Sequence, residues 1–433
     1  MMMNHLHDLA KWDDRIGAWR APAYVYAKIA RRMRNLSEPF IDMARQHQNL
    51  DNLWKPINLR SYQEAALLAW KASAGSGVVC LPTGAGKTRL ALAAAQMSNK
   101  STLCLVPTLV LLEQWQNSIR EFYSGEIGVV GGGQYSIKPV TVATFESAFR
   151  KAWLFGNRFD LLIVDEAHHF GDGERDEALE SCIAPFRLGL SATLNEPRMD
   201  RLIQLIGPKV YEQNVRDLVG TALAEFDLFR LHLRLTAAET RAYQTDYSAF
   251  NKFFSAFKTE KASYAWEDFV RLAGKSAEGR AALAAHRRSK RVLCLTERKE
   301  STLCQLIQKH STQRKLIFTA DTQTALLISK RLLIAPITAE IGKRERDRYI
   351  EAFKAGVIKS IVSCKVLNEG FDVPEAEIAI IVGGSGSDRE HIQRIGRVLR
   401  PAEGKRAQIY ELLAAETSEV NLSRRRGSKL NEL

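Results

Sequence analysis

A turn of small residues between an apolar run and a helix-forming stretch constrains the fold of this chain more than any other feature. Residues 77–81 form a β-prone apolar run, and residues 89–95 are rich in helix formers. The turn between them consists of Pro82, Thr83, Gly84, Ala85, Gly86, Lys87 and Thr88. A strand, glycine turn and helix in this order direct backbone N–H groups at a phosphate chain, although Leu81 replaces the first glycine of the general pattern. Lys87 would reach the outer phosphates and Thr88 would ligate magnesium, so the expected cofactors are ATP and Mg²⁺.

Two adjacent carboxylates downstream supply the second half of such a site. Asp165 and Glu166 directly follow the apolar run at residues 161–164. This position predicts that they lie at the carboxyl edge of a buried strand. In this interpretation Asp165 holds the hydrated metal, and Glu166 orients or deprotonates the attacking water. The expected chemistry is hydrolysis of a nucleoside triphosphate.

Strand-like and helix-like segments alternate in two separate parts of the chain. The strand-like runs lie at 77–81, 102–106, 140–143, 161–164 and 188–190 in the first part, and at 315–318, 360–363 and 378–382 in the second. Each part predicts a mostly parallel sheet covered by helices, so the fold class is α/β with two sheet lobes. The expected domains are an N-terminal segment (1–53), lobe 1 (54–212), a helical basic insertion (213–310), lobe 2 (311–415) and a basic tail (416–433).

The second lobe contains a candidate source of positive charge for hydrolysis. Gln393 is followed by Arg397 and Arg400, which share a face if the segment is helical. Fast hydrolysis needs positive charge against the developing charge on the γ-phosphate. The alternative is an ordinary basic surface helix.

The segment between the lobes interleaves aromatic and basic residues. Aromatic residues at helical spacing favour a hydrophobic core over a platform for stacked bases. The segment ends in a basic cluster that consists of Arg287, Arg288, Lys290 and Arg291. Such a cluster is either a solvated face or a surface that follows phosphates. The formal net charge of +13 suits a nucleic-acid partner, and it also suits simple solubility.

Composition disfavours several other classes of protein. The chain has no uninterrupted apolar stretch of 18 residues, so a membrane span is not expected. Its first 14 residues contain no apolar signal core, which disfavours secretion. The six cysteines form no C-x-x-C pair, so we expect reduced core thiols rather than a zinc or iron–sulfur site. These features predict a cytoplasmic protein, whose oligomeric state the sequence leaves open.

The order of short motifs resembles the superfamily 2 helicases over residues 54–415. These motifs lie at 60–63, 82–88, 106–108, 165–168, 191–193, 317–319, 369–374 and 393–400. Within that superfamily the chain is most similar to the XPB-type DNA repair and transcription helicases and their prokaryotic relatives. The segments that carry this closer resemblance are 12–24, 183–193 and 418–426.

The resemblance implies two RecA-like lobes and assigns further roles by position. Arg60 and Gln63 would read adenine, and Thr108 would contact the nucleic-acid backbone. Ser191 and Thr193 would couple hydrolysis to lobe movement. From lobe 2, Gly370 and Asp372 would line the nucleotide cleft, Gln393 would sense the γ-phosphate, and Arg397 and Arg400 would be arginine fingers. The helical insertion matches the family's thumb-like insertion.

The expected function is that of an ATP-dependent DNA helicase or duplex translocase with a role in DNA repair. Its substrate would be duplex or forked DNA, with 3′-to-5′ movement and a companion nuclease implied by the resemblance alone. Two departures argue against strong strand separation. Residues 198–200 are Arg-Met-Asp where the family often has Arg-Glu-Asp, and the N-terminal damage-recognition region is abbreviated. The alternatives are an RNA helicase, or an ATP-gated DNA-binding platform that recruits a nuclease without unwinding.

Overall fold

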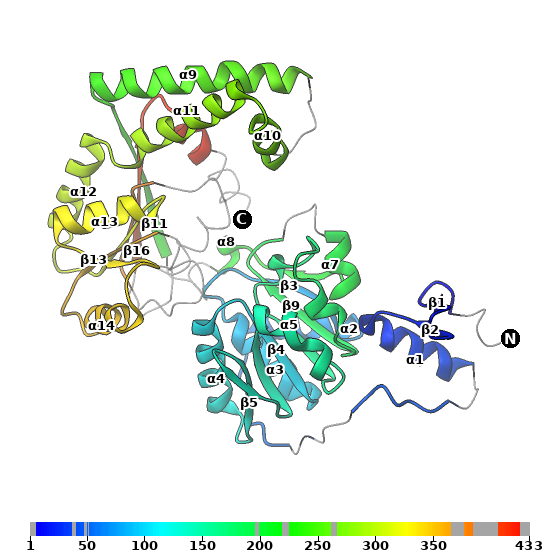
Figure 1. Ribbon diagram of the computed structural model, residues 1–433. Coiled ribbons are helices and arrows are strands. Elements are labelled where there is room, and N and C mark those ends of the chain that lie inside the picture. Colours follow the sequence, from blue (N-terminus) through cyan, green and yellow to red (C-terminus); the bar gives the residue numbers. More distant parts are fainter. Residues whose placement is uncertain are drawn as a thin grey trace. The chain divides into compact units, whose positions relative to one another are not determined.

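The computed structural model describes residues 6–36, 40–46, 50, 52–194, 199–218, 225–260, 266–364, 376–383 and 406–424. The chain divides into two compact units, with Met1–Leu218 forming the bulk of the first and the chain after Leu218 the bulk of the second. Each unit contains a sheet with helices packed on it (Figure 1). None of the described helices is long and apolar enough to cross a membrane.

The first unit is built on an eight-stranded sheet with the order β10-β3-β9-β8-β4-β7-β5-β6. All neighbours are parallel except the β5–β6 hairpin. The strands are β3 (Ser76–Cys80), β4 (Thr102–Val106), β5 (Ile127–Gly131), β6 (Gln134–Ser136), β7 (Val140–Thr144), β8 (Leu161–Val164), β9 (Phe186–Ser191) and β10 (Lys209–Glu212). The residues of β4, β7 and β8 are all buried, as expected for parallel strands covered on both faces.

Helices connect these strands and cover the sheet. They are α2 (Ser61–Ala72), α3 (Lys87–Ser98), α4 (Leu109–Phe122), α5 (Phe145–Phe155), η3 (Ala167–His169), α6 (Glu177–Glu180), α7 (Met199–Leu205) and α8 (Val215–Leu218). Thr108 and Thr144 cap α4 and α5 with their side-chain oxygens, which explains where these helices begin. The strands expected from the apolar runs of this lobe are confirmed, as is the helix expected from the helix formers at 89–95, which lie in α3.

A small β-hairpin and a helix precede the first sheet. They comprise β1 (Lys11–Asp13), β2 (Ala18–Arg20), η2 (Ala23–Val25) and α1 (Tyr26–Asn35). Trp12 and Trp19 face each other across the hairpin with ring centroids 5.9 Å apart. Arg15 and Arg20 both donate to the Asp13 carboxylate, which ties the turn to the second strand.

The second unit is built on six parallel strands with the order β11-β16-β15-β12-β14-β13. The strands are β11 (Glu225–Leu233), β12 (Lys315–Phe318), β13 (Ala335–Ile337), β14 (Ser360–Ser363), β15 (Ile378–Ile381) and β16 (Arg406–Ala414), with helices α12 (Glu297–Lys309), α13 (Thr322–Leu332) and α14 (Lys343–Lys354). The three strands expected from apolar runs are confirmed.

The expected insertion at 213–310 is too long at both ends. β11 pairs with β16 along nine residues and forms an edge of the second sheet. On the other side, Leu303 and Leu306 of α12 pack into the core of that sheet. The sequence did not predict β11, because its residues are exposed or only partly buried and do not form an apolar run. Its partner strand also lies about 180 residues further along the chain. The insertion proper is therefore helical and spans α9 to α11.

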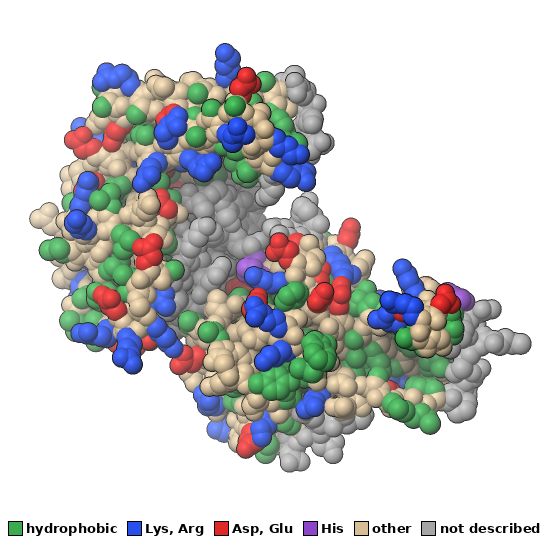
Figure 2. Space-filling model, viewed as in Figure 1, with side chains coloured by type: hydrophobic (Ala, Val, Ile, Leu, Met, Phe, Trp, Pro, Cys, Tyr) green, Lys and Arg blue, Asp and Glu red, His purple; other side chains and the backbone are tan. Residues whose placement is uncertain are grey.

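The three insertion helices are α9 (Ala237–Glu260), α10 (Trp266–Ala273) and α11 (Ala277–Cys294). They enclose their own core, in which Phe250 and Phe269 are buried and Phe253, Phe254 and Phe257 pack against them. The prediction that these aromatic side chains form a hydrophobic core is confirmed. Lys and Arg side chains are spread over the visible face of these helices (Figure 2).

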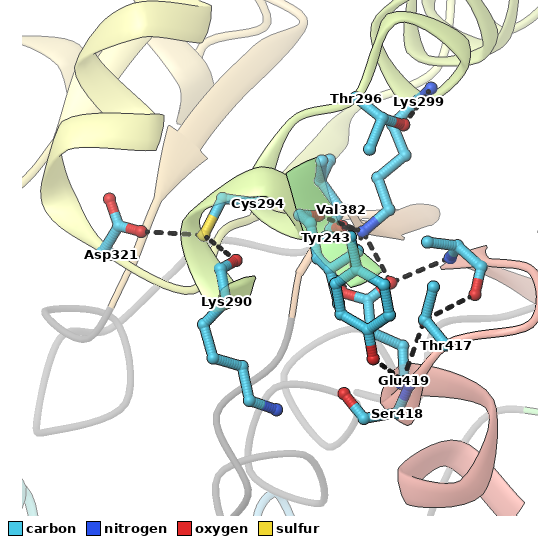
Figure 3. Close-up of polar contacts among 12 residues, drawn as sticks. Tyr243, Lys290, Cys294, Thr296, Lys299, Asp321, Val382, Thr417, Ser418 and Glu419 are labelled. Atoms are coloured by element: carbon cyan, nitrogen blue, oxygen red, sulfur yellow. Dashed lines mark hydrogen bonds and ion pairs between the residues drawn. The ribbon is translucent and has the colours of Figure 1, made fainter. Parts of the chain in front are cut away.

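A buried ion pair joins α12 to the C-terminal segment that follows β16 (Figure 3). Lys299 Nζ lies 2.8 Å from Glu419 Oε2, and it also donates to the carbonyl oxygens of Leu293 and Val382. The neighbouring Ser418 N–H donates to the hydroxyl oxygen of Tyr243 in α9 at 3.0 Å. These contacts attach the C-terminal segment to both α9 and the end of β15.

Candidate active site

Four neighbouring strands of the first sheet place the predicted site residues along one edge. β3, β9, β8 and β4 are adjacent and parallel, so the loops that follow them leave from the same edge of the sheet. These loops contain, respectively, the glycine turn, Thr193, the pair Asp165 and Glu166, and Thr108. Parallel topology therefore assembles residues that are up to about a hundred positions apart in sequence.

The glycine turn has the backbone geometry of an anion-binding loop. Gly84 and Gly86 have φ angles of +89° and +77°, in the left-handed region that favours glycine. Gly86 is the N-cap of α3 and makes no side-chain cap, so the first-turn N–H groups stay available for an anion. A Cβ at Gly86 would also lie 2.5 Å from Gln63 Nε2. Both glycines are thus required by the shape of this loop.

Residues of α2 support the turn from behind. Gln63 is buried, and its Nε2 donates to the carbonyl oxygens of Ala85 and Gly86 at 3.0 and 3.2 Å. Its Oε1 accepts from the Arg60 N–H at 2.9 Å, and the Tyr62 hydroxyl donates to Ala85 O at 2.8 Å. In this structure the Gln63 amide supports the loop, whereas the family resemblance implied that it reads adenine. The adenine roles of Gln63 and Arg60 stay predictions.

Asp165 is a buried carboxylate held by two donors. The Trp115 Nε1–H donates to Oδ2 at 2.9 Å, and the Glu166 N–H donates to Oδ1 at 3.0 Å. Burial and the Glu166 charge together raise the pKa of Asp165 to about 6, although the Lys87 ammonium and the two hydrogen bonds oppose them. The influence of Lys87 on this pKa places the lysine within electrostatic reach of the carboxylate. Trp115 was missed from sequence because it reads as one more apolar position of a helix.

The side chains present fit a triphosphate with its metal. Thr83 Oγ1 and Glu166 Oε2 are buried without a hydrogen-bond partner among the described residues, which a bound group would provide. Lys87 Nζ makes only a 3.3 Å contact with the Leu81 carbonyl in this part of the chain and can turn to a phosphate. The oxygens of Asp165 and Thr88 are the kind of ligand that Mg²⁺ prefers. We therefore assign the ATP and Mg²⁺ positions to these residues as a proposal.

A histidine connects the carboxylates to the strand β9. His168 Nδ1 lies 3.4 Å from Glu166 Oε2 and 3.1 Å from Ser191 Oγ. The Ser191 hydroxyl donates to the Thr193 carbonyl oxygen at 2.6 Å, so Nδ1 must be the donor towards Ser191. The predicted coupling residues Ser191 and Thr193 thus lie one contact from the acidic pair. The role of His168 was not assigned from sequence, although it belongs to the quoted acidic motif.

Several predicted residues lie outside the described part of the chain. These are Arg198, Gly370, Asp372, Gln393, Arg397 and Arg400. Their assigned roles stay predictions from the sequence.

The structure shows what the predicted nucleic-acid contact residues touch within the protein, and their roles toward nucleic acid stay predictions. Thr108 caps α4 by accepting from the Leu111 N–H at 3.3 Å. Arg288 forms a two-pronged ion pair with Asp246 and holds α11 to α9. Arg287, Lys290 and Arg291 instead line a pocket of about 480 Å³ between α11 and the start of α13. The basic cluster therefore divides into one structural arginine and three pocket residues.

Three family models match the chain. The type III restriction enzyme, res subunit model matches residues 56–196, and the helicase conserved C-terminal domain model matches 298–402. The Xeroderma pigmentosum group B helicase damage recognition domain model matches residues 3–44. The second match starts within α12, in agreement with the packing of α12 on the second sheet.

Similar proteins extend over most of the chain. The DNA 3′-5′ translocase XPB2 of Sulfurisphaera tokodaii is 34% identical over 426 residues, covering 96% of this chain and 95% of that protein. The DNA 3′-5′ helicase XPB of Kineococcus radiotolerans is 31% identical, covering 86% of this chain and 63% of that protein. The chain thus spans nearly the whole archaeal relative but less than two thirds of the bacterial one.

A solved structure shows the same fold. The crystal structure of the Pyrococcus furiosus Hef helicase domain matches with a TM-score of 0.54 and 17% identity, covering 86% of this chain and 98% of that one. At this identity the likeness shows the fold alone, which is that of two RecA-like lobes.

Proposed function

The chain belongs to the XPB family of superfamily 2 DNA helicases and translocases, and we propose that its glycine turn and acidic pair hydrolyse Mg²⁺-ATP to drive movement along DNA. The observation that carries this assignment is the shared sheet edge at which the glycine turn with Lys87 and the buried Asp165 both lie. As a member of this family the chain is an ATP-hydrolysing DNA helicase or translocase. The residue roles, the direction of movement and the metal belong to the proposal.

Each residue of the site has a distinct chemical task in this proposal. Lys87 and the N–H groups at the start of α3 hold the β- and γ-phosphates. Thr88 and Asp165 would hold Mg²⁺, which neutralises phosphate charge when bound. Glu166 orients the attacking water and accepts its proton. A change in the charge or hydrogen bonding of Glu166 would affect Ser191, at the end of β9, through the contacts of His168 with both residues.

Lobe 2 would complete the site with residues that the sequence alone assigns. Arg397 and Arg400 would stabilise charge on the γ-phosphate, Gln393 would sense that phosphate, and Gly370 and Asp372 would line the nucleotide. The resemblance to the family supports these roles. A companion nuclease rests on that resemblance alone.

We propose 3′-to-5′ as the direction of movement on DNA, because the two relatives described above carry these words in their names. The pocket between α11 and α13 is the proposed backbone contact of the second unit. Arg287, Lys290 and Arg291 face one acidic side chain there, Asp321, whose carboxylate is already occupied by Thr324 N–H and Cys294 S–H. The local balance is therefore positive, which suits phosphates and is independent of base sequence.

ATP hydrolysis with and without DNA tests the motor function directly. We expect duplex or forked DNA to stimulate phosphate release and Lys87→Ala to abolish it, because the phosphates lose their counter-charge. A rate of ATP hydrolysis that neither DNA nor RNA changes would contradict the motor assignment. Stronger stimulation by structured RNA would favour an RNA helicase. DNA-stimulated turnover without displacement of a third strand or a bound protein would favour the ATP-gated platform.

The pocket assignment has its own control. Arg287→Ala with Lys290→Ala should reduce the salt dependence of DNA binding by roughly one unit of the log–log slope per lost phosphate contact. Arg280→Ala removes one charge from the same helix, where Arg280 donates to the Gly274 carbonyl away from the pocket. An equal change in slope per lost charge in the double variant and in Arg280→Ala would show that only net charge matters.

A further inference from the structure

Trp115 is a buried tryptophan whose polar side-chain atom donates a hydrogen bond to Asp165, the carboxylate proposed to hold the metal. It lies in α4 with 1% of its surface exposed, and its Nε1–H donates to Asp165 Oδ2 at 2.9 Å. We propose that Trp115 is a positioning residue that fixes the Asp165 carboxylate for Mg²⁺ and connects that carboxylate to the DNA-facing start of α4. This inference rests on the proposed function, because it takes Asp165 as the metal ligand and Thr108 as a backbone contact.

The two donors on Asp165 restrict how the carboxylate can turn. An indole N–H can only donate, so Trp115 occupies a site on Oδ2 and never competes as a ligand. The Glu166 N–H occupies a site on Oδ1 at 3.0 Å. With one fixed donor on each oxygen, the plane of the carboxylate is set, and its remaining lone pairs stay free for a hydrated metal. Outer partners of this kind orient ligands at known metal centres.

A purely structural role would not require this partner. Trp70 is also buried in the same unit, and its Nε1–H donates at 2.9 Å to a backbone carbonyl oxygen, that of Arg187. A backbone carbonyl oxygen can accept the hydrogen bond of a buried indole N–H just as a carboxylate oxygen can. Trp70 is therefore a matched example of the structural role, whereas Trp115 uses its donor on the predicted metal ligand.

The position of Trp115 in α4 connects two predicted functions. Leu112, Trp115 and Ile119 are the buried residues of this helix and form one face at spacings of three and four. Thr108 caps the same helix seven residues before Trp115, a distance of about 10 Å along a helix that rises 1.5 Å per residue. Because Trp115 belongs to this packed face, a displacement of α4 would move Trp115 with it. A contact with DNA at the start of α4 would therefore reach Asp165 through a single hydrogen bond.

Comparison of Trp115→Phe with Trp70→Phe tests the proposal. Each change removes an indole N–H and keeps an aromatic ring. A fluorescent ADP analogue is titrated in Mg²⁺ and in EDTA. We expect Trp115→Phe to weaken binding in Mg²⁺ by roughly tenfold or more, as outer-partner changes do at metal sites, with little effect in EDTA. Trp70→Phe should leave both affinities within about twofold of the unchanged protein, since it touches no ligand.

A spectroscopic measurement keeps the test open if Trp115→Phe does not fold. The chain has seven tryptophans, so an indole ¹⁵N–¹H spectrum contains seven signals. The signal that Asp165→Asn displaces belongs to the indole bonded to that side chain, and we expect Mg²⁺-ADP to displace the same signal in the unchanged protein. We also expect DNA to displace it, and to stimulate ATP turnover less in Trp115→Phe.

The outcomes separate this inference from the proposed function. Equal loss of affinity in Mg²⁺ and EDTA, or an indole signal indifferent to Mg²⁺-ADP, would overturn the positioning role even if DNA-stimulated hydrolysis is intact. Conversely, absence of DNA-stimulated hydrolysis in the unchanged protein would reject the motor function, whereas the Mg²⁺-specific loss could still be observed.

Discussion

Removal of the buried ammonium of Lys299 should destabilise the second unit strongly. The Lys299 side chain is 0% exposed and that of Glu419 is 15% exposed. Nζ donates to Leu293 O at 2.7 Å, to Val382 O at 2.8 Å, and to Glu419 Oε1 and Oε2 at 2.9 and 2.8 Å (Figure 3). Lys299→Met keeps most of the aliphatic stem, so the change isolates the charge and its hydrogen bonds.

The expected magnitude follows from the unpaired carboxylate that remains. Breaking a buried pair by removing one partner costs about 3–5 kcal/mol, because the other charge stays buried without compensation. We expect the low end, about 3 kcal/mol, because Glu419 still accepts from the Ala414 N–H at 2.8 Å and is partly exposed. For a unit of roughly 200 residues, about 3 kcal/mol corresponds to a fall in Tm of roughly 6–12 °C.

Differential scanning calorimetry and urea unfolding measure this effect. Glu419→Gln in the Lys299→Met background removes the unpaired charge and should recover part of the loss, a coupling that a double-mutant cycle isolates. Lys354→Met is the surface control, since Lys354 pairs with Glu351 in the same helix at 3.2 Å and such exposed pairs contribute about 0.5 kcal/mol or less. A loss below about 1 kcal/mol for Lys299→Met, or no recovery in the double variant, would refute the reasoning.

The remaining predictions concern the nucleotide site and the insertion. Gln63→Ala should raise the KM for ATP more than it lowers kcat, because the turn loses its bonds to Ala85 and Gly86; steady-state kinetics measure this, and an unchanged KM contradicts the bracing role. Arg397→Ala should slow the chemical step and leave ATP binding nearly intact, since its contribution arises in the transition state; single-turnover hydrolysis and equilibrium binding separate the two. Burial lowers the pKa of His286, and Lys290 lowers it further, while its Nδ1 has no hydrogen bond among the described residues. The unfolded chain, with a histidine pKa near about 6.5, then binds more protons than the folded one below that pH, so the free energy of unfolding should fall as the pH drops through 6.5. His286→Phe should make urea midpoints at acidic and neutral pH more alike, and an unaltered pH dependence argues against this origin.

Most of the nucleotide site could be predicted from sequence, because its parts are local. The glycine turn needs left-handed backbone at Gly84 and Gly86, and no distant residue is required to see that. Asp165 follows a run of apolar residues whose burial places the carboxylate at a sheet edge. The eight strands expected from apolar runs (β3, β4, β7, β8, β9, β12, β14 and β15) could be predicted for the same reason, since full burial makes a parallel strand uniformly apolar.

The tertiary structure decided which polar atoms meet, since those pairs are far apart in sequence and have no pattern of their own. Trp115 and Asp165 are 50 positions apart, and Lys299 and Glu419 are 120 apart. The sequence does not distinguish Arg288 from its basic neighbours. In the structure, the packing of α9 on α11 places Asp246 against Arg288. β11 belongs to the second sheet because it pairs with β16, a strand that is distant in sequence. Local sequence sets the conformation of a turn or strand, whereas the partner of a buried donor or charge depends on how distant elements pack together.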